Sequence, residues 1–314
     1  APLSEAGGYV NFMSGDDQDR IEANYRGTDY IGKSGVEASY ERELHGTTGF
    51  EQVEIDAAGR GIRTLSRTDA VSGENIVLSL DMRLQRVAEN AFGARRGALV
   101  AIEPGTGAVL ALVSKPGFDL NLFVDGIDPQ QWAELNSSPD RPLNNRAIAG
   151  VYPPGSTFKP FTALAALEEG MLTPDELIQC TGKRVIDGQT FMNWDPYKNM
   201  PMTLGVALAN SCDTYFYDVA LRFYHREDSP LQRWSRKMGF GRLSGVDVGP
   251  EDAGLLPTPA WRRRYFKTEI DKIWTSGDSV QFAIGQGDLL VTPMQMTRAY
   301  AMIANGGKLV EPHI

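Results

Sequence analysis

The chain has 314 residues, a formal net charge of −9 and 42% hydrophobic residues. This length suits one large domain with a smaller one, and the apolar fraction supports a sizeable core. The acidic balance excludes a general nucleic-acid binder, and the arginine run 262–264 is expected to be a solvated turn. No run approaches the about 18 apolar residues of a membrane span. Because the chain opens at Ala1, we expect a processed or trimmed polypeptide.

Two cysteines, Cys180 and Cys212, are too few for a disulfide framework. We favour buried packing roles for both, with a bridge between them as the alternative, since export would permit oxidation. His45, His225 and His313 are scattered without the spacing of metal ligands, so no metal or other cofactor is expected.

Residues 1–26 are polar and rich in Gly and Asp, and they have no assigned role. The segment 26–35 is rich in turn formers. Helical spacing follows over residues 36–44 and ends at the stop signal His45-Gly46. Residues 50–55 then alternate as a strand does, so this part of the chain predicts a small extended module rather than a complete core.

Residues 76–80 (IVLSL) predict a strand that leads into Asp81. Asp81 is expected to cap an amphipathic helix that runs through Phe92. The predicted apolar face of this helix comprises Leu84, Val87, Ala88 and Ala91. Apolar runs over 97–103 and 108–114, separated by Pro-Gly-Thr-Gly, then predict an antiparallel hairpin.

After a polar connection with a short helix around Trp132, the chain reaches the segment 152–160 (YPPGSTFKP). The prolines and the glycine stiffen and turn the chain, and a helix is predicted from Ser156 to Gly170. On this helix Ser156 and Lys159 leave from one face, with Cβ atoms about 5–6 Å apart. The sequence therefore places a hydroxyl beside an amine.

A serine hydroxyl becomes a good nucleophile when a neighbouring base takes its proton, and an amine can do so only when neutral. Burial must therefore lower the pKa of Lys159 well below the usual value for lysine, near ~10.4. The apolar neighbours that could supply this burial are Phe158, Phe161, Leu164 and Leu167. The simpler interpretation is an ordinary amphipathic helix that contains a serine and a lysine.

A second polar cluster, Ser211 to Asp213, interrupts two predicted helices. Its hydroxyl and carboxylate could face the first pair. Taken alone, the cluster is better explained by Ser211 as a helix N-cap and Asp213 as the first-turn acid of the next helix.

Gly285-Gln286-Gly287 could be taken for a phosphate-binding loop. Two glycines are weak support for that, and a structural turn that lines a cleft is the favoured interpretation. Residues 289–302 predict a helix begun at Thr292-Pro293. Trp194 and Trp234 could line a substrate groove, although core packing explains them more simply.

The motif PPGSTFKP followed by Ser-x-Asp resembles the penicillin-recognising serine transferases, which carry SxxK, S-D-N and K-T-G. The likeness extends to RGTDYIGKSGVEASYERELHG, IVLSLDMRLQRVAENAF, GALVAIEPGTGAVLALVSKPGFDLN and FAIGQGDLLVTPMQMTRAYAMIANGG. These segments are similar, in the same order, to the class B penicillin-binding proteins, above all to their elongation-specific type. The resemblance covers roughly residues 26–314.

The resemblance implies an α/β (α+β) fold. Residues 76–314 would form a transpeptidase domain with an antiparallel sheet between helices, and residues 1–75 a pedestal, or dimerisation-like, module. The implied activity is that of a peptidoglycan D,D-transpeptidase of cell elongation and shape, a target of β-lactams. An N-terminal anchor would hold it at the inner membrane with its catalytic domain in the periplasm. Implied partners are pentapeptide strands and a lipid-linked glycan polymerase.

Carried onto this chain, the resemblance implies roles for individual residues. Ser156 would attack the penultimate D-Ala carbonyl, Lys159 would accept its proton and Ser211 would pass that proton to the leaving amine. Asp213 completes this catalytic set. The residues expected to contact substrate are Thr157, Gly285, Gln286 and Gly287.

Two departures from the family pattern matter. Asp213 stands where a neutral Asn is usual, and a carboxylate near Lys159 would oppose its use as a base. Either Asp213 points away, or Ser156 is activated through a relay of Lys159 and Ser211, which we favour. No Lys-Thr-Gly follows Gly287, so we expect C-terminal strands to be missing from this chain. The competing functions are a non-catalytic β-lactam sensor or scaffold and a class D-like β-lactamase.

Overall fold

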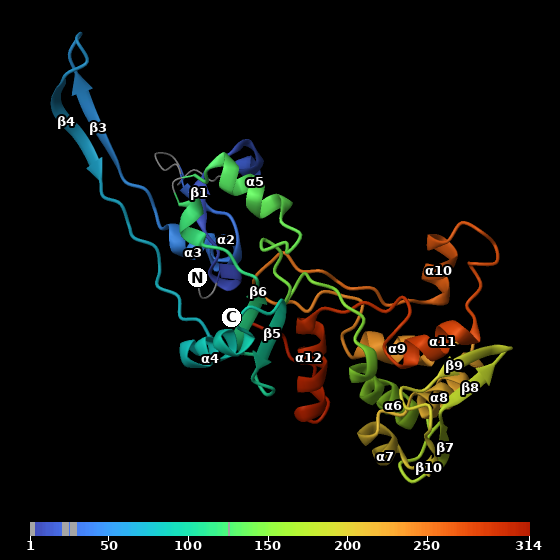
Figure 1. Ribbon diagram of the computed structural model, residues 1–314. Helices are drawn as coiled ribbons and strands as arrows, with labels where there is room; N and C mark the ends of the chain where they lie inside the picture. Colours follow the sequence, from blue (N-terminus) through green and yellow to red (C-terminus); the bar gives the residue numbers. More distant parts are fainter. Residues whose placement is uncertain (1–3, 21–24, 26–29, 125) are drawn as a thin grey trace. The chain divides into compact units, whose positions relative to one another are not determined.

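The computed structural model of the chain is drawn in Figure 1. The residues that it describes are 4–20, 25, 30–124 and 126–314. Contacts divide the chain into two compact units. The first comprises residues 1–147, 245–250 and 312–314, and the second comprises residues 148–244 and 251–311. Both units combine helices with antiparallel strand pairs, as the predicted α+β class requires.

The first unit begins with short elements. In order they are α1 (Ser4–Gly7), β1 (Val10–Phe12), η1 (Gly15–Arg20), β2 (Tyr30–Gly32), α2 (Gly35–Ser39) and α3 (Glu41–His45). The helix predicted over 36–44 is thus two short helices, divided at Tyr40. Just after the break, the buried Glu41 carboxylate accepts a hydrogen bond from the Gly32 N–H at 2.7 Å. Of the predicted turn segment, residues 26–29 lie outside the described residues.

β3 (Phe50–Ile55) confirms the predicted strand and pairs with β4 (Gly61–Thr68). The strand predicted over 76–80 is wrong, since these residues, all of them described, form no strand. Near their end, the Ser79 hydroxyl donates to the Val109 carbonyl at 2.8 Å. A hydrogen bond from a side chain therefore holds this segment, rather than the backbone hydrogen bonds of a strand.

The predicted hairpin is confirmed as β5 (Gly97–Ile102) and β6 (Val109–Lys115). The N-cap at Asp81 is also confirmed, because its carboxylate accepts from the Arg83 N–H at 2.8 Å. The short helix expected around Trp132 is α5, and the elements after the hairpin are η3 (Leu120–Phe123) and α5 (Pro129–Ser137).

α4 (Met82–Phe92) packs on β6 with a polar residue facing inward. Ala88 of the predicted apolar face is buried, but Val87 is 65% exposed, so that face is wrong. The other buried position is Gln85. Its side-chain amide accepts from the Leu112 N–H at 2.9 Å and donates to the Leu112 carbonyl at 2.8 Å. These two bonds turn the polar residue toward the strand.

The second unit is built on helices around a phenylalanine cluster. Its main helices are α6 (Lys159–Glu168), α8 (Asp213–Tyr224), α9 (Pro230–Lys237), α11 (Ser276–Ala283) and α12 (Pro293–Ala304). Phe158, Phe161, Phe240 and Phe282 contact one another with ring centroids 5.1 to 5.8 Å apart. Eight of the twelve residues of α8 are buried, so α8 is the central helix of this core.

Two strand pairs lie along α8 (Figure 1). β7 (Ile178–Thr181) pairs with β10 (Asn199–Met202), and β8 (Lys183–Ile186) pairs with β9 (Gln189–Met192). The shorter helices are α7 (Leu204–Ala209) and α10 (Pro259–Tyr265). The arginine run 262–264 lies in α10 rather than in a turn, because Thr258 caps a helix there and Pro259 begins it.

α12 begins where the sequence predicts. The Thr292 hydroxyl accepts from the Gln295 N–H at 3.1 Å, and the Gln295 side chain accepts from the Thr292 N–H at 2.9 Å, which is a capping box. The helix ends at Ala304 rather than at Met302. Within the described ranges, no helix has both the length and the apolar character that crossing a membrane requires.

Candidate active site

The proposed nucleophile lies in a tight turn before α6. Gly155–Phe158 form a 3-10 turn, so the helix predicted from Ser156 becomes α-helical only at Lys159. The Lys159 N–H donates to the Ser156 carbonyl, which places the two side chains one turn apart on the same side. Ser156 is exposed, whereas Phe158 is fully buried. The turn thus presents its hydroxyl outward and anchors its aromatic ring in the core.

The turn at Gly285 contacts the turn that carries Ser156. The Gly155 N–H donates to the Gly285 carbonyl at 2.8 Å. Gly285 has φ 74, and a Cβ there would lie 2.2 Å from the Gly155 oxygen and 2.7 Å from the Phe158 Cβ. Only glycine fits this close approach. Gln286 and Gly287, which follow, are exposed.

Lys159 is 1% exposed, and its amine has three oxygen neighbours. Nζ lies 2.8 Å from the Ser211 carbonyl, 3.0 Å from Ser211 Oγ and 2.6 Å from Asp213 Oδ1. Burial lowers the pKa of Lys159, and the bond and charge of Asp213 oppose this without cancelling it. Of the two alternatives for Asp213, the one in which it points away is wrong.

Ser211 owes its position to an unusual end of α7. Its φ is +50, the left-handed region that glycine usually occupies after a helix. The Ser211 N–H donates to the Leu208 carbonyl and the Cys212 N–H donates to the Ala207 carbonyl, which closes a Schellman motif. The N-cap of α8 is Cys212, so the interpretation of Ser211 as the cap is wrong.

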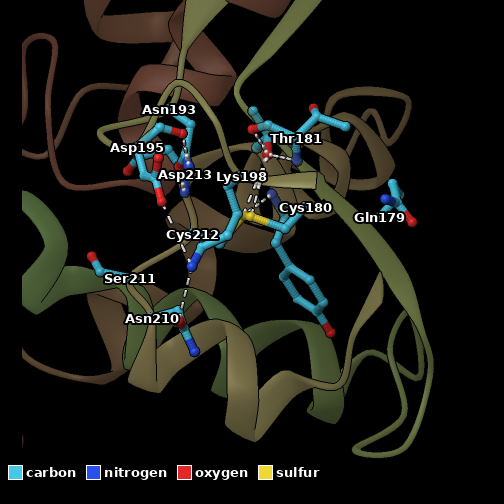
Figure 2. The surroundings of a disulfide bond; sticks show 12 residues. Gln179, Cys180, Thr181, Asn193, Asp195, Lys198, Asn210, Ser211, Cys212 and Asp213 are labelled. Carbon is cyan, nitrogen blue, oxygen red and sulfur yellow. Dashed lines mark hydrogen bonds and ion pairs between the residues drawn. A yellow bond between two sulfur atoms is a disulfide. The ribbon is translucent and has the colours of Figure 1, made fainter. Parts of the chain in front are cut away.

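Asp213 is held by the strand connection before β10. Its N–H donates to Asn193 Oδ1 at 2.8 Å, and its Oδ2 accepts from the Trp194 N–H at 3.0 Å. The Trp194 indole donates to the Asn210 carbonyl at 2.9 Å. Figure 2 shows Asn193 beside Asp213. Sequence reasoning missed Asn193, because its contact joins segments far apart in the chain.

The two cysteines form a disulfide bond, shown in Figure 2. The bridge was the alternative interpretation of the sequence, and the favoured one, two separate packing cysteines, is wrong. Both residues are completely buried. Cys180 lies on β7, and Cys212 lies between Ser211 and Asp213.

Comparison with known families fits this arrangement. The penicillin-binding protein transpeptidase domain matches residues 97–314, and the penicillin-binding protein dimerisation domain matches residues 3–78. The chain belongs to the penicillin-binding protein transpeptidase family.

Curated relatives of this penicillin-binding protein agree. Peptidoglycan D,D-transpeptidase MrdA of Acinetobacter baumannii is 42% identical over 310 residues, which are 98% of this chain and 45% of the relative. MrdA of Escherichia coli K12 is 39% identical over 319 residues, which cover 99% of this chain and 49% of the relative. The chain spans about half the length of the curated relatives it matches.

Solved structures place this penicillin-binding protein with the same group. Pseudomonas aeruginosa PBP2 in complex with WCK 5153 has a TM-score of 0.86 at 39% identity, covering 99% of this chain and 64% of that one. The complex between PBP2 and MreC from Helicobacter pylori gives 0.90 at 31% identity, covering 100% and 57%. The resemblance to the penicillin-binding proteins is therefore confirmed, and the similar proteins are of the MrdA and PBP2 type.

The remaining site predictions for this penicillin-binding protein stay predictions. The Thr157 hydroxyl donates to the Pro154 carbonyl at 2.6 Å, and the Thr157 carbonyl accepts from the Tyr300 hydroxyl at 2.8 Å. Thr157 therefore also stabilises the 3-10 turn that carries Ser156. Gln286 and Gly287 lie one and two residues beyond Gly285, the glycine that contacts this turn.

Proposed function

We propose that this protein is a peptidoglycan D,D-transpeptidase that cross-links stem peptides during cell elongation and is acylated by β-lactams at Ser156. The observation that carries the proposal is the buried Lys159 amine, one turn after an exposed serine and 3.0 Å from the hydroxyl of Ser211. An exposed hydroxyl followed by a buried amine with a second hydroxyl is the constellation that serine acyl transfer requires.

In the first step, Ser156 Oγ attacks the carbonyl carbon of the penultimate D-Ala. A C–O bond forms, the C–N bond to the terminal D-Ala breaks, and the serine proton reaches the leaving amine through Lys159 and Ser211. The Ser156 N–H supplies one donor to the oxyanion, a type of contact whose loss costs about 10²–10³ in rate. An acceptor amine then attacks the acyl carbonyl carbon, so that a C–N bond forms and the C–O bond to Ser156 breaks. The amine gives up a proton, which returns to Ser156 Oγ through Ser211 and Lys159.

The close contact of Asp213 with Lys159 supports the relay. Three oxygen neighbours match the three donors of an ammonium ion. A neutral amine keeps two of them as acceptors, and its lone pair accepts a hydrogen bond from the Ser211 hydroxyl in the third position. Ser211 is thus the neighbour through which Lys159 exchanges protons, while Asp213 keeps the amine in place.

We propose further that the catalytic part works outside the cytoplasm, anchored at the inner membrane, with residues 1–75 as pedestal and 76–314 as transpeptidase domain. The disulfide supports export, because such bonds persist in oxidising compartments. Similar proteins are described in a complex with MreC and in a peptidoglycan synthase complex of polymerization and crosslinking. On that basis we expect a lipid-linked glycan polymerase and an MreC-type protein as partners.

The proposal is tested with a fluorescent penicillin and a pentapeptide substrate. We expect covalent labelling of the full-length protein, none of Ser156→Ala, and release of D-Ala from the pentapeptide. Labelling without D-Ala release would favour the sensor or scaffold, and rapid hydrolysis of nitrocefin would favour a β-lactamase. Undiminished labelling of Ser156→Ala would refute the proposed nucleophile.

A further inference from the structure

The disulfide joins the proposed catalytic turn to a strand outside it. Cys212 lies directly between Ser211 and Asp213, and its partner Cys180 lies on β7 (Figure 2). The hydrogen-bond partners of the Lys159 amine are oxygens of Ser211 and Asp213, and neither cysteine is among them. The crosslink can therefore act on the site only through the backbone of its neighbours.

The backbone next to the crosslink adopts a conformation that serine rarely takes. Ser211 occupies the left-handed position of the Schellman motif with φ +50, where glycine would fit without strain. Glycine has no hydroxyl, so it could not supply Oγ to Lys159. A strained residue of this kind persists only when the surrounding structure over-determines it.

Two contacts to β7 fix the chain just after Ser211. Cys212 is bonded to Cys180. Thr214 Oγ1 accepts from the Thr181 N–H at 2.9 Å and donates to the Thr181 carbonyl at 2.9 Å. Asp213 has its own partners in the strand connection, Asn193 and Trp194, and does not depend on the crosslink alone. The chain just after Ser211 is thus tied to β7 at Cys212 and Thr214, and the disulfide is the tie directly adjacent to Ser211.

We propose that Cys180 and Cys212 are positioning residues for acyl transfer: their bond holds Ser211 in the left-handed conformation that directs its carbonyl and hydroxyl to Lys159. This inference rests on the proposed function. Without the bond, Ser211 relaxes toward ordinary backbone conformations. Lys159 then loses two of its three oxygen neighbours for part of the time, and acylation slows.

The test removes the crosslink by substitution, because both cysteines are completely buried. Cys180→Ser/Cys212→Ser in the full-length protein keeps an oxygen at the N-cap of α8 for the Tyr215 N–H, which now donates to Cys212 Sγ. Cys180→Val is the second variant, which fills the space at position 180 and leaves the capping sulfur in place. Acylation by a fluorescent penicillin is followed in single-turnover experiments at saturating concentration.

We expect the acylation rate constant to fall about tenfold in both variants, the loss expected when a strained conformation is no longer held. The labelled fraction and the dissociation constant of the non-covalent complex should stay unchanged. The pH dependence of the acylation rate constant should change as well. Lys159 loses the carbonyl and hydroxyl oxygens of Ser211, and these oxygens influence how readily the amine is protonated. A purely structural role would instead lower the labelled fraction at an unchanged rate constant, and this result would overturn the inference.

Phe223→Leu is the matched control. Phe223 lies near the far end of α8 and is 5% exposed, so the substitution weakens the same helix without touching the Ser211 turn. We expect its acylation rate constant to equal that of the parent protein, and an equal fall there would overturn the inference. If the parent protein is not labelled at Ser156, the proposed function itself fails. If it is labelled and the crosslink-free variants acylate at the same rate, only the positioning role fails.

Discussion

Replacing Lys159 with methionine tests how strongly the buried pair of Lys159 and Asp213 stabilises the second unit. Nζ and Oδ1 lie 2.6 Å apart, and the two side chains are 1% and 13% exposed. Methionine has a similar length, so little of the effect comes from a cavity. The substitution therefore removes the cation and its hydrogen bonds with little change in volume.

The expected loss follows from what remains unpaired. Asp213 keeps the Trp194 N–H but loses its cation, and removing one partner of a buried ion pair costs about 3–5 kcal/mol. The Ser211 carbonyl also loses a hydrogen-bond donor at 2.8 Å. The cost of this lost bond is already included in the range of about 3–5 kcal/mol. We expect the free energy of unfolding of Lys159→Met to fall by about 4 kcal/mol.

Urea unfolding followed by tryptophan fluorescence measures this loss. Four of the five tryptophans, at 194, 234, 261 and 274, lie in the second unit, so the signal reports mainly on it. Asp213→Asn and the double variant complete a cycle, in which the double loss should be smaller than the sum of the single losses. For Lys159→Met, a fall in the free energy of unfolding below about 1 kcal/mol, the amount typical of an exposed pair, would refute the reasoning. Strict additivity of the losses of the two single variants in the double variant would refute it as well.

The same pair sets a pH dependence whose sign is fixed. Burial lowers the pKa of Lys159 in the folded protein below its ordinary value of 10.5. Between the pKa of Lys159 in the folded protein and its ordinary pKa in the unfolded chain, the unfolded chain binds more protons than the folded protein. The free energy of unfolding therefore rises with pH in that window. Removing Asp213 removes an influence that raises this pKa, so in Asp213→Asn the rise begins at lower pH. Lys159→Met should lose this contribution altogether.

Three further predictions concern the site and its support. In Asp213→Asn, the acid limb of the pH profile of acylation should move to lower pH, because the pKa of Lys159 falls further. An unchanged profile would mean that Asp213 does not tune Lys159, and the argument for a relay through Ser211 would lose its basis. Thr162→Val should lower the free energy of unfolding by about 1–3 kcal/mol, since the buried Ala283 carbonyl loses its donor at 2.7 Å. Thr297→Val, which loses only a bond within α12, should change it by less than about 0.5 kcal/mol in the same urea titration. Gly285→Ala should slow labelling by penicillin more than Gly287→Ala does, because an added Cβ meets backbone at 2.2 Å only at the former; equal rates would contradict this.

Features set by local chemistry were predictable from the sequence. Prolines, glycine and the run of strong helix formers place Ser156 and Lys159 one turn apart, and flanking phenylalanines indicate that the lysine is buried. The caps at Asp81 and Thr292 were predictable for the same reason, since a cap depends on residues within one turn.

Features set by distant partners were not predictable. Gln85 faces inward because Leu112, on another element, offers it both a donor and an acceptor. The disulfide depends on β7 lying beside the start of α8, which two isolated cysteines do not reveal. The contact of Asp213 with Lys159 likewise requires tertiary structure, since the motif alone left open whether the carboxylate points toward the amine.

The interruption between α7 and α8 is itself needed for this site. Residues two apart on a continuous helix point to different sides, so Ser211 and Asp213 could not both reach one amine from a single helix. Residues two apart in extended chain share a side, and the one between them points away. The left-handed Ser211 and the extended Cys212 provide such a step, so that Ser211 and Asp213 contact Lys159 while Cys212 faces Cys180. The polar break that sequence reasoning could assign to an ordinary helix cap is therefore the geometry that allows a hydroxyl and a carboxylate to contact one lysine.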